Sequence, residues 1–294
     1  MTIVERETKA PVYLTTREVA DLLRVKERKV YELAAAGEIP HRRVTGKLLF
    51  PKDEIDAWIS GEPVGTRQAE RPAVVVGSHD PLLDWALRES RSGLAALLDG
   101  SGDGLERFLR GEAALAAMHV PEDEGWNIET VAAARPTNVV LIAFARRRQG
   151  LIHSSAATGP LSGFADLAGR RVVLRQPGSG TRSLHDRLCE EAGVAGSIVA
   201  HETVARTETD AAATVYAGDA DAALGLEAVA RQFRLDFLPL VEERFDLLVD
   251  RHAYFTPPVQ QLMAFCRTPA FAAKADAMGG YDVSEVGTVR WLSA

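Results

Sequence analysis

Cysteine is scarce in this chain. Its 294 residues include two cysteines, Cys189 and Cys266, which lie in separate predicted helices without metal-ligand spacing. We expect both to be ordinary core thiols in a reducing compartment, because structural disulfides belong mainly to secreted proteins. The seven histidines are scattered and form no H-x-x-x-H pair, so no zinc site is expected.

Long apolar runs are also missing. No stretch reaches the roughly 18 apolar residues of a membrane span. Residues 1–11 carry Glu5, Arg6, Glu7 and Lys9 where a secretory signal has its apolar core. We therefore expect a cytoplasmic protein without a membrane partner. The net charge of −7 excludes nucleic acid bound over the whole surface, but it is compatible with a local basic face.

Residues 1–60 have the pattern of a small first domain in a chain long enough for about two. The capping box Thr15-Thr16-Arg17-Glu18 opens a first helix, TREVADLLRV. A second helix, KERKVYELAAAG, ends at Gly37, where a left-handed C-cap is favourable. HRRVTGKLLF predicts a hairpin closed at Thr45-Gly46, and PKDEIDAWIS predicts a third helix. This order predicts an N-terminal all-α winged helix-turn-helix whose wing is the hairpin.

Basic residues gather at the start of the second helix and on the hairpin. Recognition helices contact base edges from such positions, and wings contact phosphates. The alternative is a solvated charged helix beside a hairpin. Because one module makes few contacts, we expect a homodimer or a higher homo-oligomer on the operator. The expected DNA-contacting residues are Thr16, Lys26, Arg28, Lys29, Tyr31, Arg42, Arg43 and Lys47.

A signature of spaced residues runs through residues 13–60. It consists of Val30-Tyr31-Glu32-Leu33, Gly37, Pro40, Gly46, Phe50 and the segment Asp53-Glu54-Ile55-Asp56-Ala57-Trp58. With this signature the segment resembles the small excisionase-type domain related to the MerR regulators. The resemblance implies sequence-specific binding of double-stranded DNA, and it does not identify the operator.

The rest of the chain predicts a linker and a second domain. Residues 61–72 (GEPVGTRQAERP) are polar with prolines near both ends, which is typical of a linker. In residues 73–294 short apolar runs alternate with amphipathic helices, a pattern that predicts an α/β fold with mostly parallel sheets. NVVLIAFARR predicts a strand buried on both faces, and DFLPLV and FDLLVD predict two further strands.

Three strand-to-helix junctions are rich in glycine and serine. They are GSHD at 77–80, GSGDG at 100–104 and GSGT at 178–181. Each brings backbone N–H groups and a hydroxyl to the positive end of a helix, which suits an anion. A single junction is equally explained as a tight turn with an N-cap, but three in one domain favour a binding site. Arg175 and Arg182 flank the third and add charge that can donate to oxygens.

Enzyme motifs do not occur at these junctions. Gly178-Ser179-Gly180 lacks the spacing of a nucleophile elbow. No loop ends in the Gly-Lys-Ser/Thr of a Walker A motif, and no Ser-His-Asp arrangement can be assigned. We therefore expect no catalytic residues, no metal site and no cofactor, and the chain is not expected to be an enzyme.

A series of motifs spans residues 73–294. They are GSHDP at 77–81, GSGDGL at 100–105, RGEAALAAMHV at 110–120, RQPGSGTR at 175–182, AGDADAALG at 217–225, FDLLV at 245–249 and GGYD at 279–282. Together they resemble the periplasmic-binding-protein-like domain of cytoplasmic regulators related to molybdate-binding proteins. The resemblance implies a type II periplasmic-binding-protein fold, with two α/β lobes, two crossover strands as the hinge and a ligand in the cleft.

The resemblance also implies boundaries. The crossovers are expected near residues 138–148 and 241–250. Lobe 1 is expected in residues 73–140 and 248–294, and lobe 2 in residues 141–247. The implied ligand-binding residues are Ser78, His79, Ser101, His119, Arg175, Ser179, Gly180, Thr181 and Arg182, although a core role is an equal alternative for His119.

A binding-protein fold joined to a DNA-binding domain implies a one-component, ligand-responsive transcriptional regulator. The expected effector is a small oxyanion, molybdate or tungstate, held by hydrogen bonds from the serine and threonine hydroxyls and by the charge of the arginines. Two alternatives stay open. One is a sensor of a small organic anion, such as a carboxylate or a sulfonate. The other is a ligand-binding or enzymatic protein with an accessory DNA-binding domain.

Overall fold

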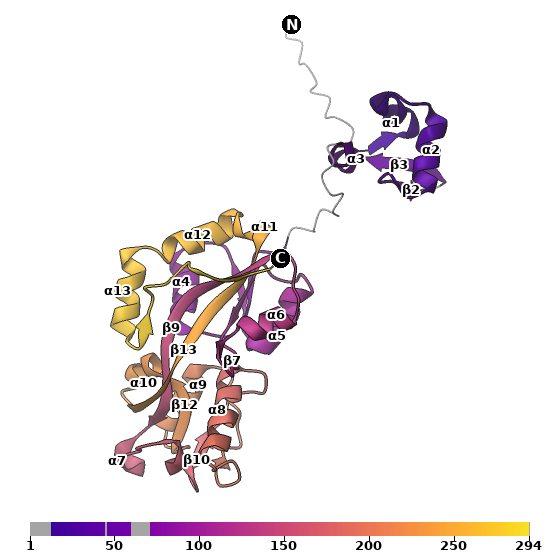
Figure 1. Cartoon of the computed structure of the whole chain (residues 1–294). Coiled ribbons are helices and arrows are strands. Elements are labelled where there is room, and N and C mark those ends of the chain that lie inside the picture. The colour runs from indigo at the N-terminus through magenta and orange to yellow at the C-terminus, as the bar shows by residue number, and fades with distance from the viewer. Residues whose placement is uncertain (1–12, 45, 60–70, 294) are drawn as a thin grey trace. The chain divides into compact units, whose positions relative to one another are not determined.

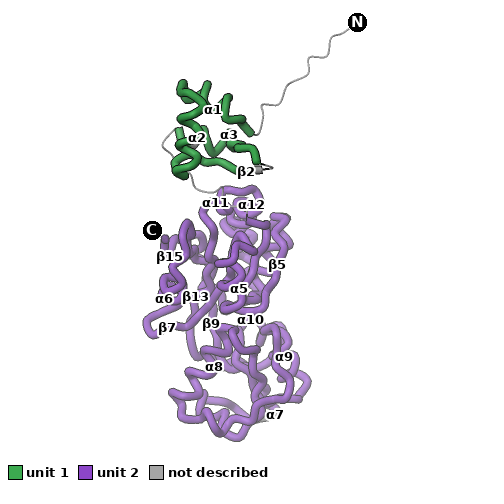
Figure 2. Tube along the Cα trace, turned by 90° about the vertical axis from the view of Figure 1, so that its right-hand side faces the viewer, with its two compact units in different colours: residues 1–69 green, residues 70–294 purple. Residues whose placement is uncertain are grey.

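The computed structural model describes residues 13–44, 46–59 and 71–293, and it divides the chain into two compact units, residues 1–69 and 70–294 (Figures 1 and 2). Most of the expected linker, residues 61–70, lies outside the described residues, as does Thr45 of the expected hairpin turn. Arg71 was also expected in the linker, but it belongs to unit 2. Its guanidinium lies 3.1 Å from Asp250 and stacks on the ring of Phe108.

Three helices and a three-stranded sheet form the described part of unit 1. The sheet is antiparallel, with the strand order β1-β3-β2. Strand β1 was not expected, so the prediction of an all-α module is wrong in this respect. The elements in chain order are β1 (Tyr13–Thr15), α1 (Thr16–Leu23), α2 (Glu27–Ala35), β2 (Arg42–Val44), β3 (Lys47–Pro51) and α3 (Lys52–Ile59).

Local signals place the helices of unit 1 where the sequence predicts them. Thr15 is the N-cap of α1, and the capping box with Glu18 is present. The backbone N–H of Thr15 donates to the Glu18 carboxylate at 2.7 Å, and this bonding lowers the pKa of Glu18. Gly37 has φ +71 just after α2, as expected for a chain leaving a helix. The helices pack on the sheet through a core that includes Val19, Val30 and Phe50.

Unit 2 is an α/β structure. Its helices are α4 (Pro81–Glu89), α5 (Ser101–Leu109), α6 (Ile128–Ala133), α7 (Ser155–Thr158), α8 (Gly180–Glu191), α9 (Glu208–Tyr216), α10 (Glu227–Phe233), α11 (Arg251–Tyr254), α12 (Pro257–Phe265) and α13 (Pro269–Met278). Its strands are β4 (Val74–Gly77), β5 (Ala95–Leu97), β6 (Leu115–Met118), β7 (Pro121–Glu122), β8 (Gly125–Trp126), β9 (Val139–His153), β10 (Arg171–Val173), β11 (Val199–Ala200), β12 (Ala222–Leu226), β13 (Asp236–Asp250), β14 (Tyr281–Asp282) and β15 (Val289–Leu292).

One ten-stranded sheet runs through the described part of unit 2. Its main order is β11-β10-β12-β9-β13-β6-β4-β5, with β14 and β15 also paired to β9. The pairs β4–β5, β4–β6, β10–β11 and β10–β12 are parallel. The prediction of a mostly parallel sheet holds only for these outer strands, because β9 and β13 pair antiparallel with each other and with their other neighbours.

The long strands β9 and β13 lie side by side through the middle of unit 2 (Figure 1). The sequence predicted two separate strands, DFLPLV and FDLLVD, where the structure has the single strand β13. The polar residues between them do not break the strand, because they stay paired with β9 across two bulges. We call residues 71–138 and 251–293 the first half of unit 2, and residues 154–235 the second half. Only β9 and β13 are shared by both.

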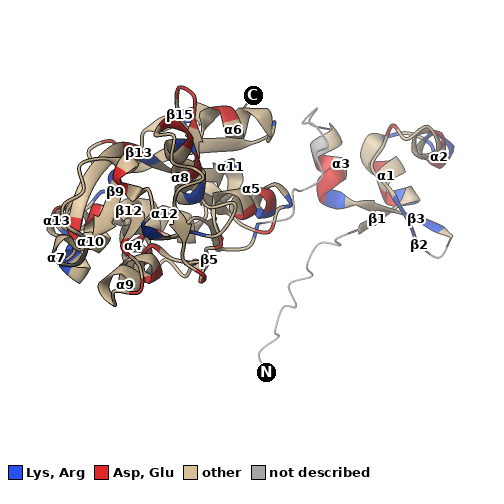
Figure 3. Ribbon diagram, turned by 90° about the horizontal axis from the view of Figure 1, so that it is seen from below, with Lys and Arg blue, Asp and Glu red and all other residues tan. Residues whose placement is uncertain are grey.

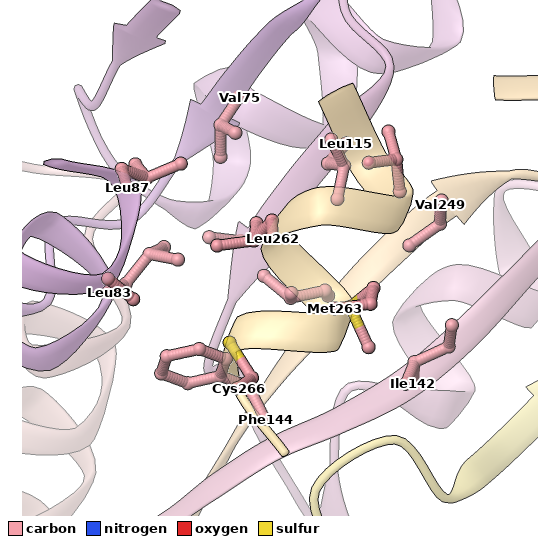
Figure 4. Close-up of a cluster of buried hydrophobic side chains, with 14 of the residues drawn as sticks. Val75, Leu83, Leu87, Leu115, Ile142, Phe144, Val249, Leu262, Met263 and Cys266 are labelled. Carbon is pink, nitrogen blue, oxygen red and sulfur yellow. The ribbon is translucent and has the colours of Figure 1, made fainter. Parts of the chain in front are cut away.

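Each half buries its own apolar side chains against the shared strands. In the first half, Leu262, Met263 and Cys266 of α12 pack between α4 and the sheet (Figure 4). In the second half, Leu184 and Cys189 of α8 pack against β10 and β12. Both cysteines are buried and free, as expected, and burial raises the pKa of Cys266 to about 12. No helix among the described residues has the length and apolar character needed to cross a membrane.

Candidate functional site

A groove of about 430 Å³ on unit 1 brings together the start of α1, the start of α2 and the β2–β3 hairpin. It contains four of the residues predicted to contact DNA: Thr16, Tyr31, Arg43 and Lys47. Arg17 lines the same groove and was not predicted, because in the sequence it is an interior residue of the capping box. Lys and Arg occur on β2 and β3, whereas α3 carries several acidic residues (Figure 3).

The other predicted DNA-contacting residues divide into two groups. Lys26, Arg28 and Lys29 are exposed at the start of α2, where Arg28 donates to Glu32 at 3.1 Å. Arg42 points elsewhere, because its guanidinium donates to Glu54 of α3 at 2.7 Å. Successive strand residues point to opposite faces, so Arg42 does not share the groove of its neighbour in the sequence. Its predicted role on the DNA face is therefore not supported by the geometry.

The first half of unit 2 contributes two buried serines that lie together. The Ser78 and Ser101 hydroxyl oxygens are 2.7 Å apart, and the backbone N–H of His119 donates to Ser101 Oγ at 3.1 Å. Glycine makes this packing possible. A Cβ atom at Gly104 in α5 would lie 2.2 Å from the Cα of Gly77, so the helix approaches the end of β4 closely. One of the two serine hydroxyls donates to the other.

The second half contributes the loop before α8. This helix begins at Gly180, with Ser179 as its N-cap. The N–H groups of the first helical residues have no acceptor four residues back in the helix. The loop contacts the first half directly. The N–H of Gly102 donates to the carbonyl of Gly178 at 3.2 Å, and a Cβ at Gly180 would lie 2.0 Å from the carbonyl oxygen of His119.

The Thr181 hydroxyl is already bound on both sides. It accepts from Gln149 Nε2 at 2.9 Å and donates to Glu208 Oε1 at 2.7 Å. The guanidinium of Arg175 donates to the same carboxylate and, at 2.9 Å, to the carbonyl of Arg206. All of these side chains apart from that of Arg206 are buried. In this arrangement the Thr181 hydroxyl gives its proton to Glu208, and the charge of Arg175 is matched by the same carboxylate.

A second buried network lies beside His119, on the paired strands β9 and β13. Arg147 donates to Asp80 at 2.8 Å and to Glu243, and its guanidinium stacks 4.2 Å from the ring of Phe245. Glu243 also lies 3.0 Å from Nδ1 of His119. Burial would raise the pKa of Glu243, but the charge of Arg147 and the contacts with His119 outweigh it and lower this pKa. The network neutralises the carboxylates and fixes the ring of His119.

Two predicted ligand-binding residues lie away from these side chains. Arg182 donates to Asp186 at 2.9 Å and lines a pocket of about 370 Å³ on the second half, beside His185 and Cys189. Thr181 and Arg182 are adjacent in a helix and point in different directions, so only the first reaches Glu208. His79 lines a pocket of about 250 Å³ that includes residues from both halves, namely Pro81, Asp84, Trp85, Arg88, Thr209, Gln232, Lys274 and Met278.

The sequence analysis missed four buried residues of this region: Arg147, Gln149, Glu208 and Glu243. One signal was available. Arg147 and Gln149 are two residues apart at the end of an apolar strand, so they share a face of β9. A charged and an amide side chain on the buried face of a strand indicate a polar site. Glu208 and Glu243 gave no such signal, because their burial depends on partners far away in the sequence.

The fold and this geometry describe a chain that joins a helix-turn-helix domain to an α/β ligand-binding domain. The family model for a helix-turn-helix domain matches residues 13–63. The model for the PBP superfamily domain matches residues 85–267, which is more than half of the chain. The chain therefore belongs to the PBP superfamily.

Two relatives and one solved structure are similar to this chain. The uncharacterized protein YvgK of Bacillus subtilis (strain 168) is 24% identical over 308 residues, which cover 94% of this chain and 96% of the relative. An uncharacterized protein from the 5′ region of the ferredoxin 2Fe-2S gene of Clostridium pasteurianum is 35% identical over 79 residues, covering 26% of this chain and 70% of the relative. A putative phosphate ABC transporter substrate-binding protein of Clostridium perfringens, solved with bound phosphate, has a TM-score of 0.52 at 13% identity, over 73% of this chain and 98% of that one. This last likeness shows a shared fold.

Proposed function

We propose that the chain is a one-component transcriptional regulator in which unit 1 binds an operator duplex and unit 2 binds a small anionic effector. The observation that carries the proposal is the contact between the first turn of α5 and the loop before α8, which come from opposite halves of unit 2 and meet at Gly102 and Gly178. Helix N-termini favour negative charge, and a ligand between the halves acts on the arrangement of both. The proposal places the protein in the cytoplasm and assigns it no catalytic step.

The DNA-binding part of the proposal assigns a role to each element of unit 1. We assign recognition to α2 and phosphate contacts to the β2–β3 hairpin, as in an excisionase or MerR-type winged module. The groove between them supports this, because Arg17, Arg43 and Lys47 line it together with Tyr31. Cations on two elements that face one concavity suit a phosphate backbone better than scattered surface charges do. A homodimer on a two-fold operator completes this part.

The ligand-binding part treats unit 2 as a type II binding protein with two lobes. In this proposal β9 and β13 are the crossover strands, and the effector binds between the halves. Both buried arginines, Arg147 and Arg175, are already paired with carboxylates. The donors left for an anion are neutral ones: a serine hydroxyl and the N–H groups at the start of α8. Such donors suit a small oxyanion, and the resemblance of the sequence makes molybdate and tungstate the first to test.

A small organic anion is the second candidate, and one observation favours it. The pocket of about 250 Å³ beside His79 is lined by Trp85 and Met278 as well as by the cation of Lys274. It also includes Thr209, the residue after Glu208. An apolar wall next to a cation suits a carboxylate or sulfonate with a hydrocarbon part.

The test uses the full chain and begins by finding the operator. Selection from random duplex DNA identifies a bound sequence, and thermal-shift screening of molybdate, tungstate, sulfate, phosphate and small carboxylates identifies an anion. The DNA affinity is then measured with and without that anion. We expect a change of at least fivefold, since typical allosteric coupling is about 1–3 kcal/mol. An anion that stabilises the protein but leaves the DNA affinity unchanged would refute the regulator, and turnover of a ligand would indicate an enzyme.

A further inference from the structure

Five buried carboxylate or amide oxygens in the described part of unit 2 have no hydrogen-bond partner, and three of these lie in ion pairs with arginines. Two remain without either kind of partner. They are Oε1 of Gln149 and Oε2 of Glu208. Both side chains are almost completely buried, with exposures of 0% and 1%. Each uses its other polar atom on the hydroxyl of Thr181. Two elements, β9 and the first residue of α9, therefore bring an unpaired acceptor each to the start of α8.

Leaving such atoms unpaired is costly. A buried acceptor without a donor costs about 1–3 kcal/mol, and a charged group costs more. Folded proteins keep few groups of this kind, and those that remain are commonly satisfied by a ligand or by water. Two of them around one hydroxyl indicate a place that is completed by a donor from outside the chain.

The side-chain donors of Thr181, Ser179 and Arg175 are already engaged. The Thr181 proton is given to Oε1 of Glu208, and the Ser179 hydroxyl donates to the carbonyl of Gln176 at 2.9 Å. Arg175 donates to Oε1 of Glu208 and to the carbonyl of Arg206. None of these groups is bonded to the two free acceptors, so the missing donor is expected on the ligand.

The charge of Glu208 restricts the ligand further. Molybdate, tungstate and sulfate carry no proton at neutral pH, so all of their oxygens only accept hydrogen bonds. An oxygen of that kind facing Oε2 of Glu208 meets a like charge in a buried site, where repulsion is weakly screened. An anion with its own hydroxyl, amino or acid proton instead donates to this carboxylate, and its charged oxygens accept from the N–H groups of α8.

We infer that the effector is an anion that also carries at least one hydrogen-bond donor, which Glu208 and Gln149 accept. The inference rests on the proposed anion site in unit 2 and narrows its ligand. It predicts that a singly protonated tetrahedral anion or a hydroxy acid binds in preference to molybdate, tungstate or sulfate of similar size. Glu208 thus acts as a specificity residue as well as the partner of Arg175.

Matched anion pairs test the inference on the unmodified full chain. Titration calorimetry compares hydrogen phosphate with sulfate and molybdate, and lactate with propionate, at one pH and one ionic strength. Within the pair that binds, we expect the member with the donor to bind at least tenfold more tightly. Equal or reversed affinities would overturn the inference, but they would still agree with the proposed anion site in unit 2. If none of the five anions binds, the proposed anion site itself fails and the inference fails with it.

A substitution provides the second measurement. Glu208→Gln keeps an acceptor for Thr181 and replaces the free oxygen by an amide group that donates. We expect it to reduce the ratio of phosphate to sulfate affinity at least tenfold, or the lactate to propionate ratio if that pair binds. Glu202→Gln, at an exposed glutamate of the same half, is the control and should keep the ratio of the unmodified protein. An unchanged ratio in a folded Glu208→Gln variant would remove Glu208 from ligand selection, and if that variant does not fold, the anion pairs still decide.

Discussion

At the residue scale, two adjacent arginines of β9, Arg146 and Arg147, differ sharply in their surroundings. Arg147 is 1% exposed and bonded to Asp80 and Glu243, whereas Arg146 is partly exposed and pairs with Glu285 on the surface. The pleat of the strand causes this difference, since adjacent side chains leave opposite faces. Similar residues in one tripeptide therefore contribute very differently to stability.

We predict that Arg147→Met lowers the free energy of unfolding by about 3–5 kcal/mol, because it leaves two buried carboxylates without a counter-charge. Arg146→Met is the matched control and should cost less than about 1 kcal/mol, as expected for a surface ion pair. Urea unfolding of both variants followed by circular dichroism measures the difference. Equal losses would show that the buried network does not contribute more than the surface pair.

Asp246 gives a pH-dependent prediction. Burial raises its pKa to about 6, against the hydrogen bond from Asn127 and the charge of Arg290, which act to lower it. The folded state therefore binds this proton more tightly than the unfolded state. The contribution of Asp246 to the free energy of unfolding is fully present below the unfolded pKa near 3.8. This contribution is lost as the pH rises through about 6.

Asp246→Asn should remove this dependence, because the amide keeps an acceptor for Asn127 and carries no charge. We expect the variant to gain roughly 2–3 kcal/mol relative to the unmodified protein between pH 4 and pH 8. Asp123→Asn, at an exposed position, should show no such gain. Denaturant titrations at the two pH values give the result, and a parallel shift of both proteins would contradict the assignment to Asp246.

At the scale of elements, the β2–β3 hairpin separates two neighbouring arginines by function. Arg43 lines the groove with Lys47, whereas Arg42 is held by Glu54 of α3. Alternation along β2 thus decides which of the two can reach a phosphate. In the proposed DNA-binding role, strand alternation rather than the local density of charge favours Arg43 over Arg42.

We predict that Arg43→Ala weakens binding to all duplexes and reduces the salt slope of the affinity by about one. Arg42→Ala should leave the slope unchanged, although it removes a surface ion pair. Fluorescence anisotropy with one duplex over a range of salt concentrations separates the two outcomes. The same salt slope for both variants would contradict a role of the groove in DNA binding.

The position of α8 against the first half of unit 2 depends on a glycine at its first residue. Gly180 touches the carbonyl of His119 from the other half, so a methyl group has no room there. We predict that Gly180→Ala separates the halves and weakens binding of the effector at least tenfold. Gly163→Ala is the control, because no atom lies within 4 Å of its Cβ position and its φ suits alanine. Calorimetry with whichever anion binds checks both variants.

At the scale of the whole molecule, the two units have separate cores and separate proposed ligands. We predict two thermal transitions in a calorimetric scan. Binding stabilises only the unit that carries the site, by about 2.7 kcal/mol at a ligand concentration one hundred times the dissociation constant. The anion on its own should therefore raise the transition of unit 2, and operator DNA on its own should raise that of unit 1. A single transition that responds to either ligand would contradict separate unfolding of the two units.

Much of this architecture follows from local sequence patterns. The capping box at Thr15 was visible in the sequence, and it opens a helix in the structure. The N-cap hydrogen bonds join residues three positions apart, so the amino-acid order is enough to predict them. The glycine-serine junctions were found for the same reason. Sheet direction was predicted less well, because the pairing of β9 and β13 joins segments almost a hundred residues apart.

The sequence by itself determined where the helices of unit 1 begin, that β9 is apolar on both faces, and that two domains follow one another. Only the tertiary structure decided which polar side chains meet. Arg147 reaches Asp80 and Glu243 across 67 and 96 residues, and Thr181 reaches Glu208 across 27. Those contacts depend on strand register and helix rotation, where a shift of one residue turns a side chain away. The candidate ligand site is for that reason a property of the fold, built on loops that the sequence already marked.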